Sequence, residues 1–152
     1  MNTFVKWFLL NACIVTGVVF AEFEGAISLI IENDKSYLAI VIMVLYVIMS
    51  GFVGMLSFKA DVAKAEEKLE LSRSSRTAWF SAEHFFSLGL LGTIIGLVLA
   101  TSGGLDAAKP VSEIVAGLKK GLNTAFFTTI CGIVFSLLLQ IQLLILETGL
   151  KK

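Results

Sequence analysis

Hydrophobic residues fall into four long runs, and the charged residues lie in the short segments between them. The runs cover about residues 4–21, 37–58, 82–101 and 122–147. A helix rises about 1.5 Å per residue and a hydrocarbon core is about 30 Å thick, so each run is long enough to cross a bilayer. The pattern predicts an all-α integral membrane protein, with four transmembrane helices in a single membrane domain over residues 1–152.

The segments between the runs predict further helix. Residues 59–80 are rich in helix formers with opposite charges at helical spacing, which predicts a cytoplasmic helix continuing the second run. Residues 102–121 form the predicted outer loop, because Thr101-Ser102-Gly103-Gly104 is expected to break the third run. After Pro110, a short amphipathic helix is expected at the membrane interface, and residues 23–31 predict a similar piece.

The basic residues predict the orientation. Five lie between the second and third runs, whereas Lys35 is the one basic residue between the first and second, beside four acidic residues. Lys6 and the C-terminal Lys151 and Lys152 fit the same side as the group of five. Because cytoplasmic loops carry an excess of Lys and Arg, both termini are predicted in the cytoplasm of a bacterial-type inner membrane. Three lysines fall on the outer side and count against this topology: Lys109, Lys119 and Lys120.

The first run has a second interpretation. Lys6, the apolar stretch after it and Val19-Phe20-Ala21 resemble a secretory signal with a small-residue cleavage site. We expect an uncleaved first span, and the cleaved signal stays open as the alternative.

Composition excludes several function classes. Charged residues make up 16% of the chain, against about a quarter in soluble domains, and a net charge of zero gives no field for nucleic acid. Cys13 and Cys131 lie in separate apolar runs and are expected to be small hydrophobes rather than a disulfide or metal pair. With no nucleophile–base pair, metal set or phosphate loop, no enzyme and no cofactor is expected.

The third and fourth runs each carry one stripe of small and weakly polar residues. At about 100° per residue, the members of each stripe lie within about 60° and about 80° of arc. They are Gly89, Thr93, Gly96 and Ala100 on the third run, and Ala125, Thr129, Gly132, Ser136 and Gln140 on the fourth. Such stripes pack membrane helices closely, as the Gly92/Gly96 pair also predicts. Recurring hydroxyls, together with a glutamine that needs a partner or water in lipid, favour instead a stripe that faces a narrow lumen.

Ionisable residues are missing from the second, third and fourth runs between their ends. A hydroxyl group does not hold and release a proton at neutral pH, so a proton carrier would have to come from another polypeptide. A small drug/proton antiporter, which needs its own membrane carboxylate, is therefore disfavoured.

Two motifs resemble a known family. The segment Gly89-Leu90-Leu91-Gly92-Thr93-Ile94-Ile95-Gly96-Leu97 resembles the third span of the MotA/TolQ/ExbB proton-channel family. The segment Ala125-Phe126-Phe127-Thr128-Thr129-Ile130-Cys131-Gly132 resembles its last span. The resemblance implies a homopentameric ring that encloses two copies of a single-span partner of the ExbD/TolR/MotB type. That partner would carry the membrane aspartate, and the transported ion would be H⁺, with Na⁺ not excluded.

The resemblance also implies roles for individual residues. Thr93 and Thr129 match the pore threonines and would hydrogen-bond the partner's aspartate, and Ser136 and Gln140 extend that path. The residues Gly89, Gly92, Gly96, Ala125 and Gly132 would pack closely at the pore, the glycines at 92, 96 and 132 leaving clearance for rotation. Glu83 and His84 are candidates for a cytoplasmic exit, or form an interfacial ion pair.

Some positions depart from the family. Thr124 stands where the ExbB-like branch has a glutamate, and Leu138 to Gln142 lacks the family's proline. The cytoplasmic region is short, which favours a minimal motor for an envelope process over flagellar torque. The predicted function is a ring-forming subunit of an energy-transducing channel driven by the proton-motive force. The alternative is a non-conducting four-helix membrane scaffold or assembly protein.

Overall fold

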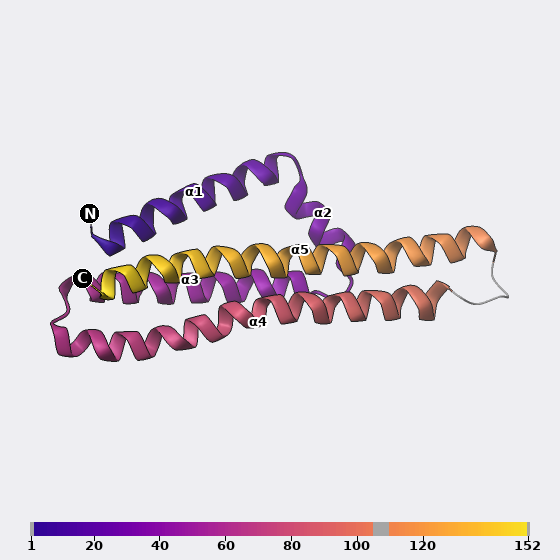
Figure 1. The fold of residues 1–152 in the computed structure, drawn as a ribbon. Helices are drawn as coiled ribbons and strands as arrows, with labels where there is room; N and C mark the ends of the chain where they lie inside the picture. Colours follow the sequence, from indigo (N-terminus) through magenta and orange to yellow (C-terminus); the bar gives the residue numbers. More distant parts are fainter. Residues whose placement is uncertain (1, 105–109, 152) are drawn as a thin grey trace.

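Five helices make up the computed structural model, which describes residues 2–104 and 110–151 (Figure 1). They are α1 (Thr3–Phe23), α2 (Ala26–Asn33), α3 (Leu38–Val62), α4 (Ala65–Gly104) and α5 (Val111–Leu150). All except the short α2 are long and apolar enough to cross a membrane. The predicted all-α fold with four membrane-spanning helices is confirmed, and the chain is a multi-pass membrane protein.

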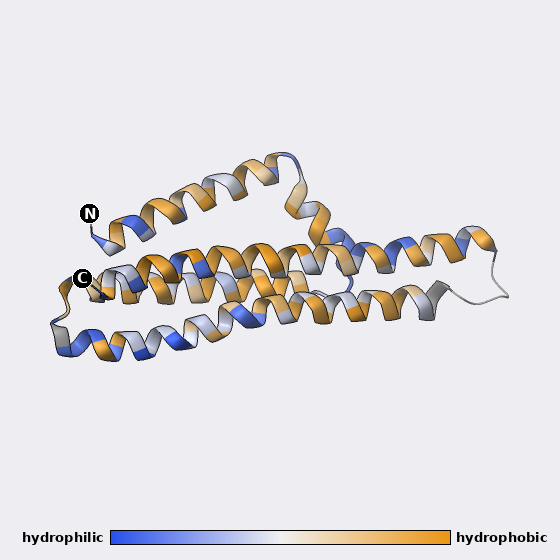
Figure 2. Ribbon diagram, viewed as in Figure 1, coloured by the Kyte–Doolittle hydropathy of each residue, from blue (hydrophilic) through white to orange (hydrophobic). Residues whose placement is uncertain are grey.

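The centre of the fold is the antiparallel pair α4 and α5, which run side by side along most of their length (Figure 1). Helix α3 packs against both, and its buried Ile42 and Val53 meet Phe85 of α4 and Leu139 and Leu143 of α5 in one apolar core. Apolar residues cover the middle of the long helices, while polar residues gather in the first turns of α4 (Figure 2). The remaining apolar faces, which would be exposed in water, are those that meet lipid.

Helix α1 is tied to the bundle near its start and diverges from it toward α2 (Figure 1). The Asp61 carboxylate of α3 accepts hydrogen bonds from the backbone N–H groups of Thr3 at 2.8 Å and Phe4 at 2.9 Å. The Trp7 ring lies directly on Gly54, where an added Cβ would approach its Cη2 atom to 2.6 Å. These contacts build α1 into the fold and favour the uncleaved first span over the cleaved signal.

Both termini and the turn between α3 and α4 lie at the same end of the bundle (Figure 1). Thr3 contacts Gly149 near the C-terminus as well as Asp61 near the end of α3. This arrangement matches the predicted topology, in which these three segments share one side. That this side is the cytoplasm stays a prediction.

The structure differs from the sequence-based expectation at the predicted cytoplasmic helix, residues 59–80. Helix α3 ends at Val62, Ala63 is extended, and a new helix begins at Ala65 and continues without interruption into the third span. The physical reason is a helix start: the Glu67 carboxylate accepts the backbone N–H of Lys64 at 3.2 Å, and Glu66 and Glu67 favour the positive end of the helix dipole. Charge pairing along the segment predicted its helicity but not this break.

The predicted outer loop, residues 102–121, is also mostly helical. Helix α4 extends through Gly104, with the Thr101 hydroxyl bonded back to the Leu97 carbonyl at 3.0 Å. Helix α5 begins directly after Pro110, so the expected amphipathic piece forms the first turns of the last span. Proline is favoured at the start of a helix because it has no N–H, and the first N–H groups of a helix have no partner within the helix. Lys109, counted in the orientation, lies outside the described residues.

A short helix does follow the first span, but α2 covers Ala26–Asn33 rather than the expected residues 23–31, and Phe23 ends α1. Its position at the membrane interface stays a prediction. Gly25 joins α2 to α1 with a φ of 73°, a left-handed conformation that glycine adopts without steric cost. The turn redirects the chain from the far end of α1 back toward α5 (Figure 1).

Candidate functional site

The small-residue stripes of the third and fourth spans face each other across the α4/α5 interface. A Cβ added at Gly132 would lie 2.7 Å from the Phe85 carbonyl oxygen and 2.8 Å from the Gly89 Cα. A Cβ at Gly96 would lie 2.5 Å from the backbone nitrogen of Ala125. The two helix backbones are therefore in direct contact, which is possible only because these positions carry little or no side chain.

This interface accounts for the predicted close-packing residues within one chain. All five are buried in the seam between the two helices: Gly89, Gly92, Gly96, Ala125 and Gly132. Their close packing needs no second subunit. The implied role of the glycines at 92, 96 and 132, clearance for a rotating partner, gains no support from this placement and stays a prediction.

Thr93 and Thr129 come together at the edge of this seam. Their hydroxyl groups are hydrogen-bonded to each other, and both side chains are half-buried. The Thr129 hydroxyl also lies 2.8 Å from the Ala125 carbonyl oxygen, and the Thr93 hydroxyl 3.3 Å from that of Gly89. The two threonines predicted as a pair from separate motifs thus form one hydroxyl site.

The face beside this hydroxyl site has no covering helix among the described residues. Leu90 on α4 and Phe126 on α5 are each about 60° around the helix from the neighbouring threonine, and they are 51% and 62% exposed. By contrast, Thr128, one residue before Thr129, is completely buried against Gly92. The fold therefore covers one flank of the α4/α5 seam and leaves open the flank that carries Thr93 and Thr129.

A groove on the same pair of helices brings together three of the other predicted residues. Glu83, Ser136 and Gln140 line it with Phe86, Ile133 and Leu137, and its volume is about 360 Å³. Ser136 is bound to the wall, donating a hydrogen bond of 2.7 Å to the Ala82 carbonyl. The Gln140 amide donates to the Ser136 oxygen at 3.1 Å.

His84 is not part of this groove. Its Nδ1 atom lies 2.7 Å from the Phe80 carbonyl oxygen, and its ring stacks on that of Phe80 at 3.8 Å. The structure thus separates the predicted pair, Glu83 lining the groove and His84 packing on its own helix. It shows no ion pair between them.

An apolar belt separates the hydroxyl site from the groove. Thr129 and Ser136 are seven positions apart, which is about 10 Å along the helix. Phe86 and Ile133 are the groove-lining residues nearest in sequence to Thr93 and Thr129. Among the described residues, α4 and α5 therefore have two separate polar sites, the hydroxyl site and the groove. No continuous row of polar side chains joins the two.

No family model matches the chain, and no curated protein or solved structure matches it at a significant level. The family resemblance accordingly rests on the two motifs alone.

The sequence analysis missed a polar cluster inside the membrane. The buried Gln142 amide joins three helices: its oxygen accepts from Trp7 Nε1 at 3.1 Å and Ser50 Oγ at 2.9 Å. Its nitrogen donates to Tyr46 Oη at 2.9 Å and Asn11 Oδ1 at 3.3 Å. Isolated polar residues in three otherwise apolar runs were the available signal, because each needs a partner in lipid.

Thr124, where the sequence differs from the resembled motif, has a structural role beside the segment that joins α2 and α3. Its hydroxyl donates to the Asn33 carbonyl at 2.9 Å and accepts the backbone N–H of Lys35 at 3.2 Å. The neighbouring Asp34 is buried and accepts the backbone N–H groups of Ser36 and Ala39, at 2.9 and 2.8 Å. These contacts fix the turn into α3, and they leave the Asp34 carboxylate occupied by backbone N–H groups around the start of that helix.

The described part of the chain has no set of metal ligands, because no three His, Cys, Asp or Glu side chains converge there. Cys131 is buried in α5, while Cys13 is exposed on α1. Both cysteines are free, as the sequence predicted.

Proposed function

We propose that this chain is the ring-forming wall subunit of a channel driven by the proton-motive force. The observation that carries this proposal is the hydroxyl site of Thr93 and Thr129, which lies half-buried at the uncovered flank of α4 and α5. Residues 38–58 of α3, 85–100 of α4 and 122–146 of α5 include no Asp, Glu, Lys, Arg or His. The wall therefore needs an acid from a second protein, and a single-span helix with a membrane aspartate supplies one.

The hydrogen-bonding capacity of the two threonine hydroxyl groups supports a carboxyl group supplied by a second protein. Two hydroxyl groups have two hydrogens and four lone pairs. One hydrogen is shared between the threonines, and the other is directed to a helix carbonyl, that of Ala125 or Gly89. Lone pairs remain free to accept from a protonated carboxyl group. To solvate the ionised carboxylate, a threonine must give up its helix carbonyl, so the site favours the aspartate in its neutral form.

The apolar belt supports movement of the carrier rather than hopping along the wall. A proton at the hydroxyl site would have to move about 10 Å along the helix, past the apolar side chains of Phe86 and Ile133, before it reaches Ser136 and Gln140. A neutral carboxyl group on a moving partner crosses such a belt at far lower cost than a charge does. In this proposal, the groove with Glu83 at its rim is the release station on the cytoplasmic side.

The assembly in this proposal is a homopentamer in a bacterial-type inner membrane, with both termini cytoplasmic and two copies of the partner inside the ring. It follows the MotA/TolQ/ExbB resemblance. The process that it powers would lie in the cell envelope, since only residues 65–80 of α4 are available for a cytoplasmic contact.

The test is proton flux into vesicles that contain the chain together with an aspartate-bearing partner. Thr129→Val keeps the shape of the side chain and removes the hydroxyl, and we expect flux to fall about tenfold or more, which corresponds to about 1.4 kcal/mol at the site. Thr16→Val is the matched control, because Thr16 is exposed on α1 and bonds only to the Ala12 carbonyl of its own helix. Undiminished flux in Thr129→Val would remove the role assigned to the hydroxyl site.

A non-conducting scaffold is the second candidate, and one observation favours it. The small residues of both stripes are fully used in packing α4 against α5. An axial view of the purified oligomer separates the two functions: a central helix pair next to Thr93 and Thr129 fits the channel, and a dry, sealed centre fits the scaffold.

A further inference from the structure

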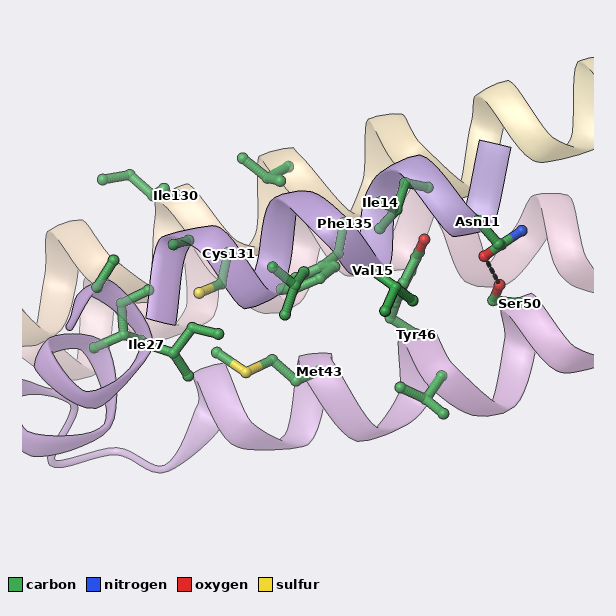
Figure 3. Close-up of a pocket in the computed structure, with 16 residues that line it drawn as sticks. Asn11, Ile14, Val15, Ile27, Met43, Tyr46, Ser50, Ile130, Cys131 and Phe135 are labelled. Atoms are coloured by element: carbon green, nitrogen blue, oxygen red, sulfur yellow. Dashed lines mark hydrogen bonds between the residues drawn. The ribbon is translucent and has the colours of Figure 1, made fainter. Parts of the chain in front are cut away.

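A cavity of about 520 Å³ lies between α1, α2, α3 and α5, away from the α4/α5 hydroxyl site. It forms where α1 diverges from the bundle, with Ile27 of α2 at one end and Asn11 and Ser50 at the other (Figure 3). Val15 and Val47, which line it from α1 and α3, are 60% and 67% exposed. The cavity is therefore open sideways, toward the acyl chains of the bilayer.

The chemistry of the lining selects a hydrocarbon. Three of its side chains are polar, and all three are hydrogen-bonded within the protein. The Ser50 hydroxyl shares its one hydrogen between Asn11 Oδ1 and Gln142 Oε1, each at 2.9 Å. The Asn11 amide donates to the Trp7 carbonyl at 2.9 Å, and Tyr46 Oη accepts from Gln142. A ligand that buried a polar ring in this cavity would have to break one of these hydrogen bonds, whereas an alkyl chain would not.

The length of the cavity matches one leaflet. Its lining on α1 extends from Asn11 to Ala21, about 15 Å at 1.5 Å per residue. A hydrocarbon core of about 30 Å gives each leaflet about 15 Å. A single acyl chain from the leaflet on the α2 side thus reaches from the α1–α2 turn to the polar cluster.

The charges at the α1–α2 turn select the headgroup. Glu22 and Glu24 are exposed beside the lining residues Ala21 and Ala26. Lys35 is the one basic residue between the first and second spans. Carboxylates at this level attract an ammonium group and repel a headgroup with net negative charge.

We propose that this cavity is a lipid site, which holds one acyl chain of an amine-headed zwitterionic phospholipid such as phosphatidylethanolamine. The occupant stabilises the free half of α1, which has few protein contacts beyond Asn11. This site is independent of the proposed channel function.

The experiment is native mass spectrometry of the protein extracted in mild detergent from vesicles of equal phosphatidylethanolamine and phosphatidylglycerol. Val18→Phe places a ring in the cavity, and Val19→Phe, the next residue on α1, makes the same change outside it. We expect wild type and Val19→Phe to retain phosphatidylethanolamine, and retention in Val18→Phe to fall about tenfold, as expected when a filled site is overpacked. Val134→Phe fills the cavity from α5 and should behave like Val18→Phe, with circular dichroism showing that all variants are folded.

Three results would overturn the proposal. Equal retention in Val18→Phe and Val19→Phe would place the lipid elsewhere on the surface. Retention of phosphatidylglycerol in preference to phosphatidylethanolamine would contradict the headgroup selected by Glu22 and Glu24. Absence of lipid from wild type would contradict a lipid site in the cavity.

Discussion

Replacing Gln142 with leucine removes an amide that joins α1, α3 and α5 within the membrane. The side chain is completely buried and has four hydrogen-bonding partners at 2.9 to 3.3 Å. Leucine has nearly the same size, so it removes the amide from this polar cluster with little change in volume. The change therefore tests the hydrogen bonds with little disturbance of packing.

The expected loss is about 3 kcal/mol of the free energy of unfolding. At about 0.6 kcal/mol for each side-chain hydrogen bond between membrane helices, four bonds contribute about 2 kcal/mol. The Trp7 N–H, left without its acceptor, adds about 1 kcal/mol more. A double-mutant cycle with Trp7→Phe should give a coupling energy of about 1 kcal/mol, since the two side chains share one bond.

The assay is reversible unfolding in mixed micelles or bicelles, followed by circular dichroism. Gln140→Leu is a matched control, because Gln140 is half-buried, two residues away and donates one described hydrogen bond, to Ser136. We expect it to cost about 0.6 kcal/mol or less. An equal or larger loss in Gln140→Leu, or a coupling energy near zero for Gln142 and Trp7, would refute the reasoning.

Two further changes test how the helices are fixed. Asp61→Ala should lower the free energy of unfolding by about 1 kcal/mol in the same assay, because the first N–H groups of α1 lose their acceptors. Asp61→Asn should lower the free energy of unfolding by less. Equal losses in the two variants would argue against the cap. Gly96→Ala should cost about 2 kcal/mol or more, since its Cβ would meet Ala125 at 2.5 Å. Gly51→Ala, with nothing described within 4 Å, should instead stabilise by about 0.5 to 1 kcal/mol. A loss at Gly51 as large as at Gly96 would contradict the close contact of α4 and α5.

The sequence was sufficient for the number and type of the spans, because length and hydropathy alone decide whether a helix fits a bilayer. It was insufficient at the helix ends. Whether the charged segment after Phe58 continues α3 or begins α4 depends on one backbone turn at Ala63 and on one carboxylate, that of Glu67. Capping energies of about 1 kcal/mol are too small to stand out from the charge pattern around them.

The stripes show a second limit of sequence reasoning. Their angular positions predicted correctly that Thr93 and Thr129 belong with the small residues. An angle on a helix does not tell what lies opposite, and here Gly89, Gly96 and Gly132 face the neighbouring helix of the same chain. Of the stripe residues, Thr93, Thr129 and Gln140 are half-buried and remain open to an outside partner.

The order in which α1 finds its partners has a consequence for biogenesis. Asn11 leaves the ribosome early, but Gln142, which it binds, is made more than a hundred residues later. At cellular rates of synthesis, that interval is on the order of ten seconds. During this time α1 has its contacts to α3, through Asp61 and Ser50, but Asn11 and Trp7 lack their partner on α5. A truncation before Gln142 should therefore leave a first helix that is held by α3 alone.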